Sequence, residues 1–147
     1  LYVCGNHDHY SEQSMHGCIC VEDDIYVYKG IRILGLGGSM RYIPHAENQY
    51  TEREMRRRVR RLCLKLMKYK GFDILMTHSP AFEINDMEDL PHRGFKSFVT
   101  LMDKYKPKFF VHGHVHATYG SRFKRLDHYK ETTIVNAYEK YIIEYPD

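Results

Sequence analysis

The most informative segment of this chain is Phe109-Phe110-Val111-His112-Gly113-His114-Val115-His116. Its first three residues are apolar, which is typical of a buried β-strand, and a glycine and two histidines follow where such a strand should end. Alternate residues of an extended segment point to the same side, and the glycine leaves room for close approach. The stretch therefore predicts a strand that presents two imidazole groups beyond its carboxyl end.

Two earlier segments repeat this arrangement. Leu1-Tyr2-Val3-Cys4 precedes Gly5-Asn6-His7-Asp8, and Ile74-Leu75-Met76 precedes Thr77-His78-Ser79-Pro80. The apolar runs read as buried strands of an α/β sheet, and in open α/β sheets ligands bind beyond the carboxyl ends of the strands. The polar residues of all three motifs are therefore candidates for one functional site.

A long helix is predicted between Thr51 and Gly71. Thr51 is a suitable N-cap, Glu54 completes a capping box, and Gly71 can end the helix in a left-handed conformation. Apolar residues at helical spacing should face the core: Met55, Val59, Leu62, Leu66 and Met67. The same helix carries a basic run: Arg53, Arg56, Arg57, Arg58, Arg60 and Arg61. A basic helix can bind nucleic acid or an anionic membrane, but we expect these arginines to form a solvated face.

The rest of the chain predicts a second helix and a hairpin. The helix should run from near Arg93 to Lys104, and Pro107 prevents its continuation. Its inward residues are expected to be Phe95, Phe98, Leu101 and Met102. Lys29-Gly30 separates two β-rich runs, residues 25–28 and 31–34, which is typical of a two-residue hairpin turn. Strands that alternate with helices and then follow one another indicate a mixed α/β structure.

Composition limits the class of protein. The chain has 147 residues, of which 43% are hydrophobic, and this is enough for one domain or most of one. Its apolar runs are far shorter than the ~20 residues that span a bilayer, so we expect no membrane partner. The four cysteines show no regular spacing, which suits a reducing cytoplasm. The net charge of +3 does not by itself imply a polyanionic partner.

The three motifs together resemble the calcineurin-like metallophosphoesterase superfamily, whose signature runs Asp-x-His, Gly-Asp, Gly-Asn-His-Asp/Glu, an isolated His and Gly-His-x-His. The last three elements are present here in that order, while only four residues precede Gly5. We therefore expect residues 1–147 to be one incomplete domain that lacks its N-terminal part. The resemblance extends to a loop at residues 35–39 and to a closing hairpin of residues 133–137 with residues 141–145. It implies a four-layer α/β fold, in which two sheets form a sandwich flanked by helices.

The resemblance also implies a site with two divalent metal ions. Such ions, about 3.5–4 Å apart, lower the pKa of a bridging water and clamp the phosphoryl oxygens of a phosphomonoester or phosphodiester. Asn6, His78 and His114 would bind one ion, and His116 would bind the other. Imidazole and oxygen ligands suit Mn²⁺, which is favoured here, and also Fe, Zn²⁺ or Ni²⁺. Histidines are often core or surface groups instead, and Asn6 could merely stabilise a turn.

The resemblance makes His7 the donor of a proton to the leaving group. An imidazole pKa of about 6.5 suits this role near neutral pH, and Asp8 would orient the ring and hold it charged. The same two residues could also be a hydrogen-bonded surface pair. His92 could meet a substrate phosphate at a helix start, although a solvated residue is commoner there.

These expectations define one main function and two alternatives. The main prediction is a cytoplasmic phosphate-ester hydrolase to which this chain contributes part of the site. A non-catalytic interaction scaffold of the same fold is the first alternative, and nucleic-acid binding through the helix of residues 53–61 is the second. Since the N-terminal ligands of the family are absent, the chain alone should hold at most one weakly bound ion and show negligible hydrolysis. The natural substrate and the oligomeric state do not follow from the sequence.

Overall fold

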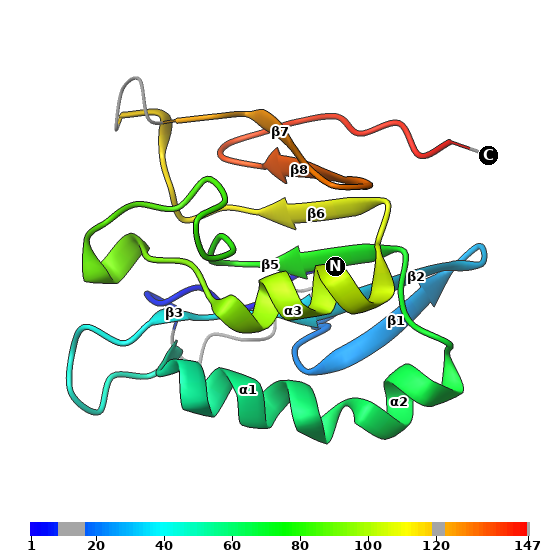
Figure 1. Ribbon diagram of the computed structural model, residues 1–147, viewed down its shortest axis with the longest axis horizontal. Coiled ribbons are helices and arrows are strands. Elements are labelled where there is room, and N and C mark those ends of the chain that lie inside the picture. The colour runs from blue at the N-terminus through cyan, green and yellow to red at the C-terminus, as the bar shows by residue number, and fades with distance from the viewer. Residues whose placement is uncertain (9–16, 119–122, 147) are drawn as a thin grey trace.

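The computed structural model describes residues 1–8, 17–118 and 123–146, and these form a mixed α/β structure (Figure 1). Six strands make the main sheet: β1 Asp24–Tyr28, β2 Ile31–Leu36, β5 Ile74–Thr77, β6 Phe109–His112, β7 Leu126–Tyr129 and β8 Thr132–Asn136. Their order is β1-β2-β5-β6-β8-β7. The four inner strands are parallel, and β1 and β7 are antiparallel to their neighbours. The mixed α/β class is therefore confirmed, while the four-layer arrangement stays a prediction.

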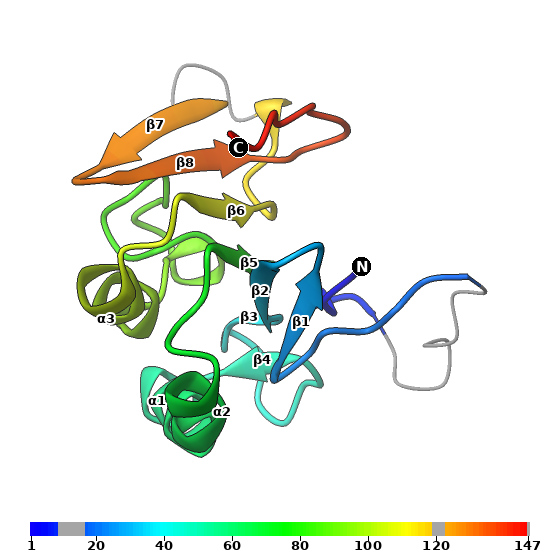
Figure 2. The same ribbon diagram turned by 90° about the vertical axis from the view of Figure 1, so that its right-hand side faces the viewer.

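Smaller elements complete the architecture. β3 (Ser39–Met40) and β4 (Gln49–Tyr50) form a two-stranded sheet. The helices are α1 Glu52–Arg61, α2 Cys63–Lys68, α3 Lys96–Tyr105 and a short 3-10 helix, Leu90–His92. In Figure 2 the three α-helices cover one face of the main sheet. Among the described residues, no helix has the length and hydrophobicity that crossing a bilayer requires.

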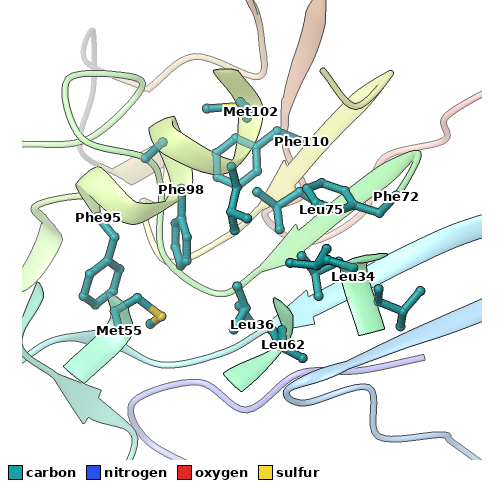
Figure 3. Packing of buried hydrophobic residues seen from close by; sticks show 14 of the residues in the cluster. Leu34, Leu36, Met55, Leu62, Phe72, Leu75, Phe95, Phe98, Met102 and Phe110 are labelled. Atoms are coloured by element: carbon teal, nitrogen blue, oxygen red, sulfur yellow. The ribbon is translucent and has the colours of Figure 1, made fainter. Parts of the chain in front are cut away.

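The core lies between the helices and the main sheet. Figure 3 shows Phe98 and Met102 of α3 beside Phe110 of β6. Met55 and Leu34, from α1 and β2, belong to the same fully buried cluster. The inward residues predicted for the second helix are all buried: Phe95, Phe98, Leu101 and Met102. That helix begins at Lys96 rather than near Arg93, because Phe95 still has an extended backbone.

The predicted long helix begins as expected and is then interrupted. Glu54 N donates to Thr51 Oγ1, and the Glu54 carboxylate accepts from Thr51 N, so the capping box is confirmed. Leu62 separates α1 from α2. At the end of α2, Gly71 is left-handed (φ 95°) as predicted, but Lys70 (φ 54°) enters this region one residue earlier. The interruption at Leu62 has no evident cause in the sequence.

The prediction of which apolar residues of this helix face the core is confirmed except for the last of them. Met55, Leu62 and Leu66 are buried, whereas the side chain of Met67 is 73% exposed. Each residue of an α-helix turns by about 100° from the one before. Met67 therefore points away from the direction that Leu66 shares with the core, and its assignment to the stripe was wrong.

Arg58 corrects the expectation of a solvated arginine face. Arg53, Arg56, Arg57, Arg60 and Arg61 are exposed as predicted. Arg58 is only 6% exposed, because it sits on the inner side of α1 and pairs with the carboxylates of Glu22 and Asp23.

The predicted hairpin is confirmed. Tyr28 faces Ile31 across the turn, and Lys29 and Gly30 both have positive φ, 47° and 84°. Two consecutive left-handed residues are what a type I′ turn requires.

Two predicted strands are wrong. Residues 1–4 contribute only an isolated bridge between Tyr2 and Cys20, because Cys4 makes its backbone hydrogen bonds with a loop and a side chain, Gly38 N and the Glu22 carboxylate. The predicted partner of β8, residues 141–145, has no regular structure. β8 pairs with β6 on one side and β7 on the other, so both of its edges are already used.

An ion pair between Arg32 and Asp73 connects β2 to the residue before β5. From this ion pair we predict how the stability of the fold depends on acid pH. Arg32 donates to both Asp73 carboxylate oxygens, at 2.6 and 2.8 Å. These bonds lower the pKa of Asp73. The stabilisation is therefore present above the unfolded-state pKa of about 3.9 and disappears as the pH falls through the lower folded-state value.

We expect Asp73→Asn to lower the free energy of unfolding by about 1–2 kcal/mol at pH 7, since the pair is partly exposed to solvent. Urea denaturation should show this difference shrinking between pH 4 and pH 2. A difference that is unchanged at pH 2 would contradict the role of the ion pair.

Candidate functional site

Three side chains from the three sequence motifs meet beyond the carboxyl ends of β5 and β6. His78 Nε2 lies 2.8 Å from Asn6 Oδ1 and 3.0 Å from His114 Nδ1. β5 and β6 are parallel neighbours, with Met76 opposite Val111, so the residues that follow each strand lie side by side. We call Asn6, His78 and His114 the histidine cluster.

The backbone around the cluster is adapted to this close approach. A Cβ atom on Gly5 would lie 2.8 Å from His78 Cε1, so a larger residue there would displace the ring. The backbone of His114 is left-handed, with φ 65°, and residues other than glycine rarely adopt this conformation. Strain of this kind persists only where the surrounding structure holds it, and it often occurs at functional sites.

Hydrogen bonding defines the protonation state of the cluster. His114 Nε2 lies 2.9 Å from the carbonyl oxygen of Pro91. Because a carbonyl only accepts, Nε2 carries the proton and His114 Nδ1 presents a lone pair. His78 Nε2 is then the donor, and Asn6 Oδ1 and His114 Nδ1 both face its one proton.

This arrangement fits a divalent cation. Burial lowers the pKa of His78 to about 3 and also lowers the pKa of His114, so both rings are neutral at pH 7. Neutral imidazoles and amide oxygens are metal ligands. The bond from His114 to Pro91 is the type of contact that orients a ligating imidazole. The described residues contain no group of three His, Cys, Asp or Glu side chains arranged for a metal; the cluster offers two imidazoles and one amide.

Tyr42 and Glu22 support the cluster, and sequence reasoning missed both. Asn6 Nδ2 donates to the Tyr42 hydroxyl at 3.0 Å, which directs Oδ1 toward His78. The Glu22 carboxylate accepts from Cys4 N and Gly37 N, and so joins the first motif to the glycine loop. Neither residue lies in a motif, so only the tertiary structure identifies them.

The other predicted site residues lie at the edge of the cluster or outside it. His116 is exposed and its ring stacks on Tyr138, with centroids 4.6 Å apart. His7 is exposed, and its charge contributes to the lowered pKa of His78. The Asp8 carboxylate accepts from Gly5 N at 2.6 Å, within its own turn. The catalytic assignment of His7 and Asp8 and the ligand assignment of His116 stay predictions.

Two further histidines adjoin the cluster. His92 lies with its ring centroid 5.0 Å from that of His114, and its Nδ1 is 2.6 Å from the Asp89 carboxylate. His112 is wholly buried behind the cluster and stacks on Phe110. Burial lowers the pKa of His112 to about 4.

Neutral buried histidines make the metal-free protein sensitive to mild acid. His78 and His112 have folded-state pKa values of about 3 and about 4, below the unfolded value of about 6.5. The unfolded chain therefore binds more protons as the pH falls below 6.5, and stability that is complete above that pH is lost progressively.

We expect each of these histidines to remove about 2 kcal/mol of unfolding free energy between pH 7 and pH 5. Denaturant titrations in the presence of a chelator measure this loss. His78→Gln should lower by one the number of protons that the chain takes up on unfolding at pH 5, and His128→Gln, at an exposed position of β7, is the matched control. An unaltered slope in the His78 variant would contradict the assignment.

Comparison with known proteins identifies the fold. No protein-family model and no curated protein matches the chain. One solved crystal structure is 18% identical, with a TM-score of 0.56, over 82% of this chain and 46% of its own. The crystal structure of TT1561 of Thermus thermophilus is 15% identical, with a TM-score of 0.51, over 81% of this chain and 49% of its own. The chain thus spans about half the length of these proteins, and it shares their fold.

Proposed function

We propose that the protein is a metal-dependent phosphoesterase and that this chain supplies part of its active site. The observation that carries the proposal is that residues from three separate motifs meet at one atom: Asn6 Oδ1 and His114 Nδ1 lie 2.8 and 3.0 Å from His78 Nε2. Asn6 Oδ1 and His114 Nδ1 compete for the single proton of His78 Nε2. A cation at that position would satisfy all three groups.

The residues of this chain would have distinct roles. Asn6 Oδ1, His78 Nε2 and His114 Nδ1 would hold one ion, and His116 would hold a second. Divalent ions in such a site supply an activated water and neutralise phosphoryl charge. His7 would donate a proton to the leaving-group oxygen, and Asp8 would orient its ring. We favour Mn²⁺, with Fe, Zn²⁺ or Ni²⁺ also suitable.

The proposal includes the four-layer fold of the calcineurin-like metallophosphoesterase superfamily, with a second large sheet formed together with further chain. The likeness to proteins about twice as long supports this part of the proposal. Completion of the domain would also provide the remaining metal ligands.

The direct test uses the full-length protein. Its metal content is measured by mass spectrometry, and hydrolysis of an aryl phosphomonoester and an aryl phosphodiester is followed with Mn²⁺ and with a chelator. We expect hydrolysis that the chelator abolishes and added Mn²⁺ restores. A protein that holds no metal and hydrolyses neither ester with any of the four metals would instead support a non-catalytic scaffold.

A further inference from the structure

The outer face of α1 is entirely basic. Half of the 10 residues of this helix are exposed arginines: Arg53, Arg56, Arg57, Arg60 and Arg61. Because each residue of an α-helix turns by about 100° from the one before, these five side chains fall in one arc of about 140° opposite the buried Met55. Within Glu52–Arg61, no other residue falls in that arc. We call the five side chains the arginine face.

No carboxylate neutralises the arginine face in the part of the chain that the structure describes. The two acidic residues of α1 are bound elsewhere: Glu54 to the N-cap and to Arg41, and Glu52 to the first backbone amides of α3. The ion pairs of Arg58 lie on the inner side of the helix. The arginine face therefore presents its positive charges directly to solvent.

The stability of the helix does not explain this arrangement. Arg60 and Arg61 lie in the last turn, where positive charge interacts favourably with the helix dipole, but Arg53 lies in the first turn, where it is unfavourable. Like charges four residues apart on a helix also repel each other. Arg53, Arg57 and Arg61 follow one another at that spacing. A bound polyanion would offset this repulsion.

The chemistry of the arginine face fits a phosphate backbone better than a protein or a membrane. A guanidinium group presents its donors in a planar fork that matches the oxygens of a phosphate. The core of a protein interface is apolar, and a helix that lies on a membrane inserts an apolar face, but every residue in this arc is an arginine. The exposed apolar side chains of Leu64 and Met67 lie outside the arc, on α2.

The arginine face begins at the end of the main sheet that carries the histidine cluster. In Figure 1 the amino end of α1 lies at the end of the sheet toward which β5 and β6 point. Tyr42 connects the two regions: its hydroxyl accepts from Asn6 Nδ2, and its backbone N–H donates to the side chain of Gln49. Gln49 belongs to β4, the strand directly before α1. A short path of contacts therefore joins the cluster to the start of the arginine face.

We infer that the arginine face binds the sugar-phosphate backbone of a nucleic acid, without reading its sequence. Arginine–phosphate contacts of this kind position a nucleic acid and carry no sequence information directly. The binding does not depend on the proposed phosphoesterase activity. A nucleic acid is nevertheless a polymer of phosphodiesters, one of the two classes of ester that the proposed activity would hydrolyse.

The test measures the affinity of the full-length protein for a fluorescent single-stranded oligonucleotide of mixed sequence, made as DNA and as RNA. Anisotropy is followed at several salt concentrations with a chelator present, which prevents metal-dependent hydrolysis. The variant replaces Arg53, Arg57 and Arg61 by glutamine, a residue that also favours helix. Each contact with a phosphate of a single strand contributes about 0.7 to the slope of log affinity against log salt concentration. We therefore expect this slope to fall in magnitude by about 2 and the affinity at 0.1 M salt to fall by roughly 100-fold.

The matched control removes the same charge from other elements, by replacing the exposed residues Lys29, Lys104 and Lys140 with glutamine. It should keep the salt slope of the wild type. Thermal unfolding of the arginine variant should show no loss of stability, because the substitutions remove repulsion between like charges. Any loss of binding is then separate from a loss of fold.

A wild-type protein that binds neither DNA nor RNA would overturn the inference, and so would equal losses of affinity in the two triple variants. Vesicles that contain phosphatidylserine provide a further comparison. If the protein binds these vesicles instead of the oligonucleotides, and replacement of Leu64 and Met67 by alanine abolishes that binding, the surface is a membrane contact and the inference is wrong. Because no hydrolysis assay enters the test, the arginine face and the phosphoesterase can fail separately.

Discussion

Replacement of His114 by alanine in the full-length protein is expected to lower metal-dependent hydrolysis by about 10³-fold, since a bound ion stabilises the transition state by several kcal/mol. His114 Nδ1 is one of three ligand atoms at the centre of the cluster, 3.0 Å from His78 Nε2. Its removal also frees the Pro91 carbonyl that fixes the ring. The variant should therefore lose bound metal and hydrolytic activity together.

Steady-state kinetics and metal analysis on the same samples measure this effect. His128→Ala is the matched control, because His128 is an exposed histidine on the edge strand β7. It should retain full activity and full metal content.

Asn6→Ala should lower hydrolysis and metal content as His114→Ala does, because the Asn6 amide oxygen also faces His78 Nε2. Full activity in both cluster variants would remove the basis for the proposed site.

Local features of the fold were predictable from the sequence. The capping box of Thr51 and Glu54 involves residues three positions apart, and the hairpin turn needs only Lys29 and Gly30. Their geometry depends on neighbours in the chain, so sequence alone is sufficient. The three motifs were also found by local pattern, a glycine or histidine after an apolar run, and the structure brings Asn6 to His78 across 72 positions.

Features that depend on distant partners were not predictable. The sequence of β8 is compatible with several partners, and its pairing with β7 is determined by which edge is available. Arg58 adjoins the exposed Arg57 in sequence, and its partners Glu22 and Asp23 lie more than 30 positions away, so the ion pairs that it makes on the inner side of α1 could not be predicted.

The buried Arg58 also provides the largest expected effect on stability. Its side chain is 7% exposed and that of its partner Glu22 is 17% exposed. Arg58 donates to Gly37 O at 2.9 Å, and Glu22 accepts from Gly37 N and Cys4 N, so the pair connects α1 to the first motif and the glycine loop. Arg58→Leu would leave the Glu22 carboxylate buried without its counter-charge. Removing one partner of a buried ion pair costs about 3–5 kcal/mol.

Thermal and urea unfolding of Arg58→Leu should therefore show a loss of that size, and Glu22→Gln should show a smaller one, because Arg58 keeps its ion pair with Asp23. The double variant should be more stable than the sum of the single losses implies, because it no longer leaves the Glu22 charge buried without its counter-charge. Lys106→Ala is the control: it breaks an ion pair with Glu131 in which both side chains are more than 60% exposed, and it should cost less than about 1 kcal/mol.

The position of Cys4 and therefore of Asn6 depends on Glu22, so metal affinity should fall in the Glu22 variant and stay unchanged in the Lys106 variant. Additive losses in the double variant, or equal losses at Arg58 and Lys106, would mean that Arg58 and Glu22 are not coupled as a buried ion pair. Unchanged metal affinity in the Glu22 variant would mean that Glu22 does not hold the first motif in place.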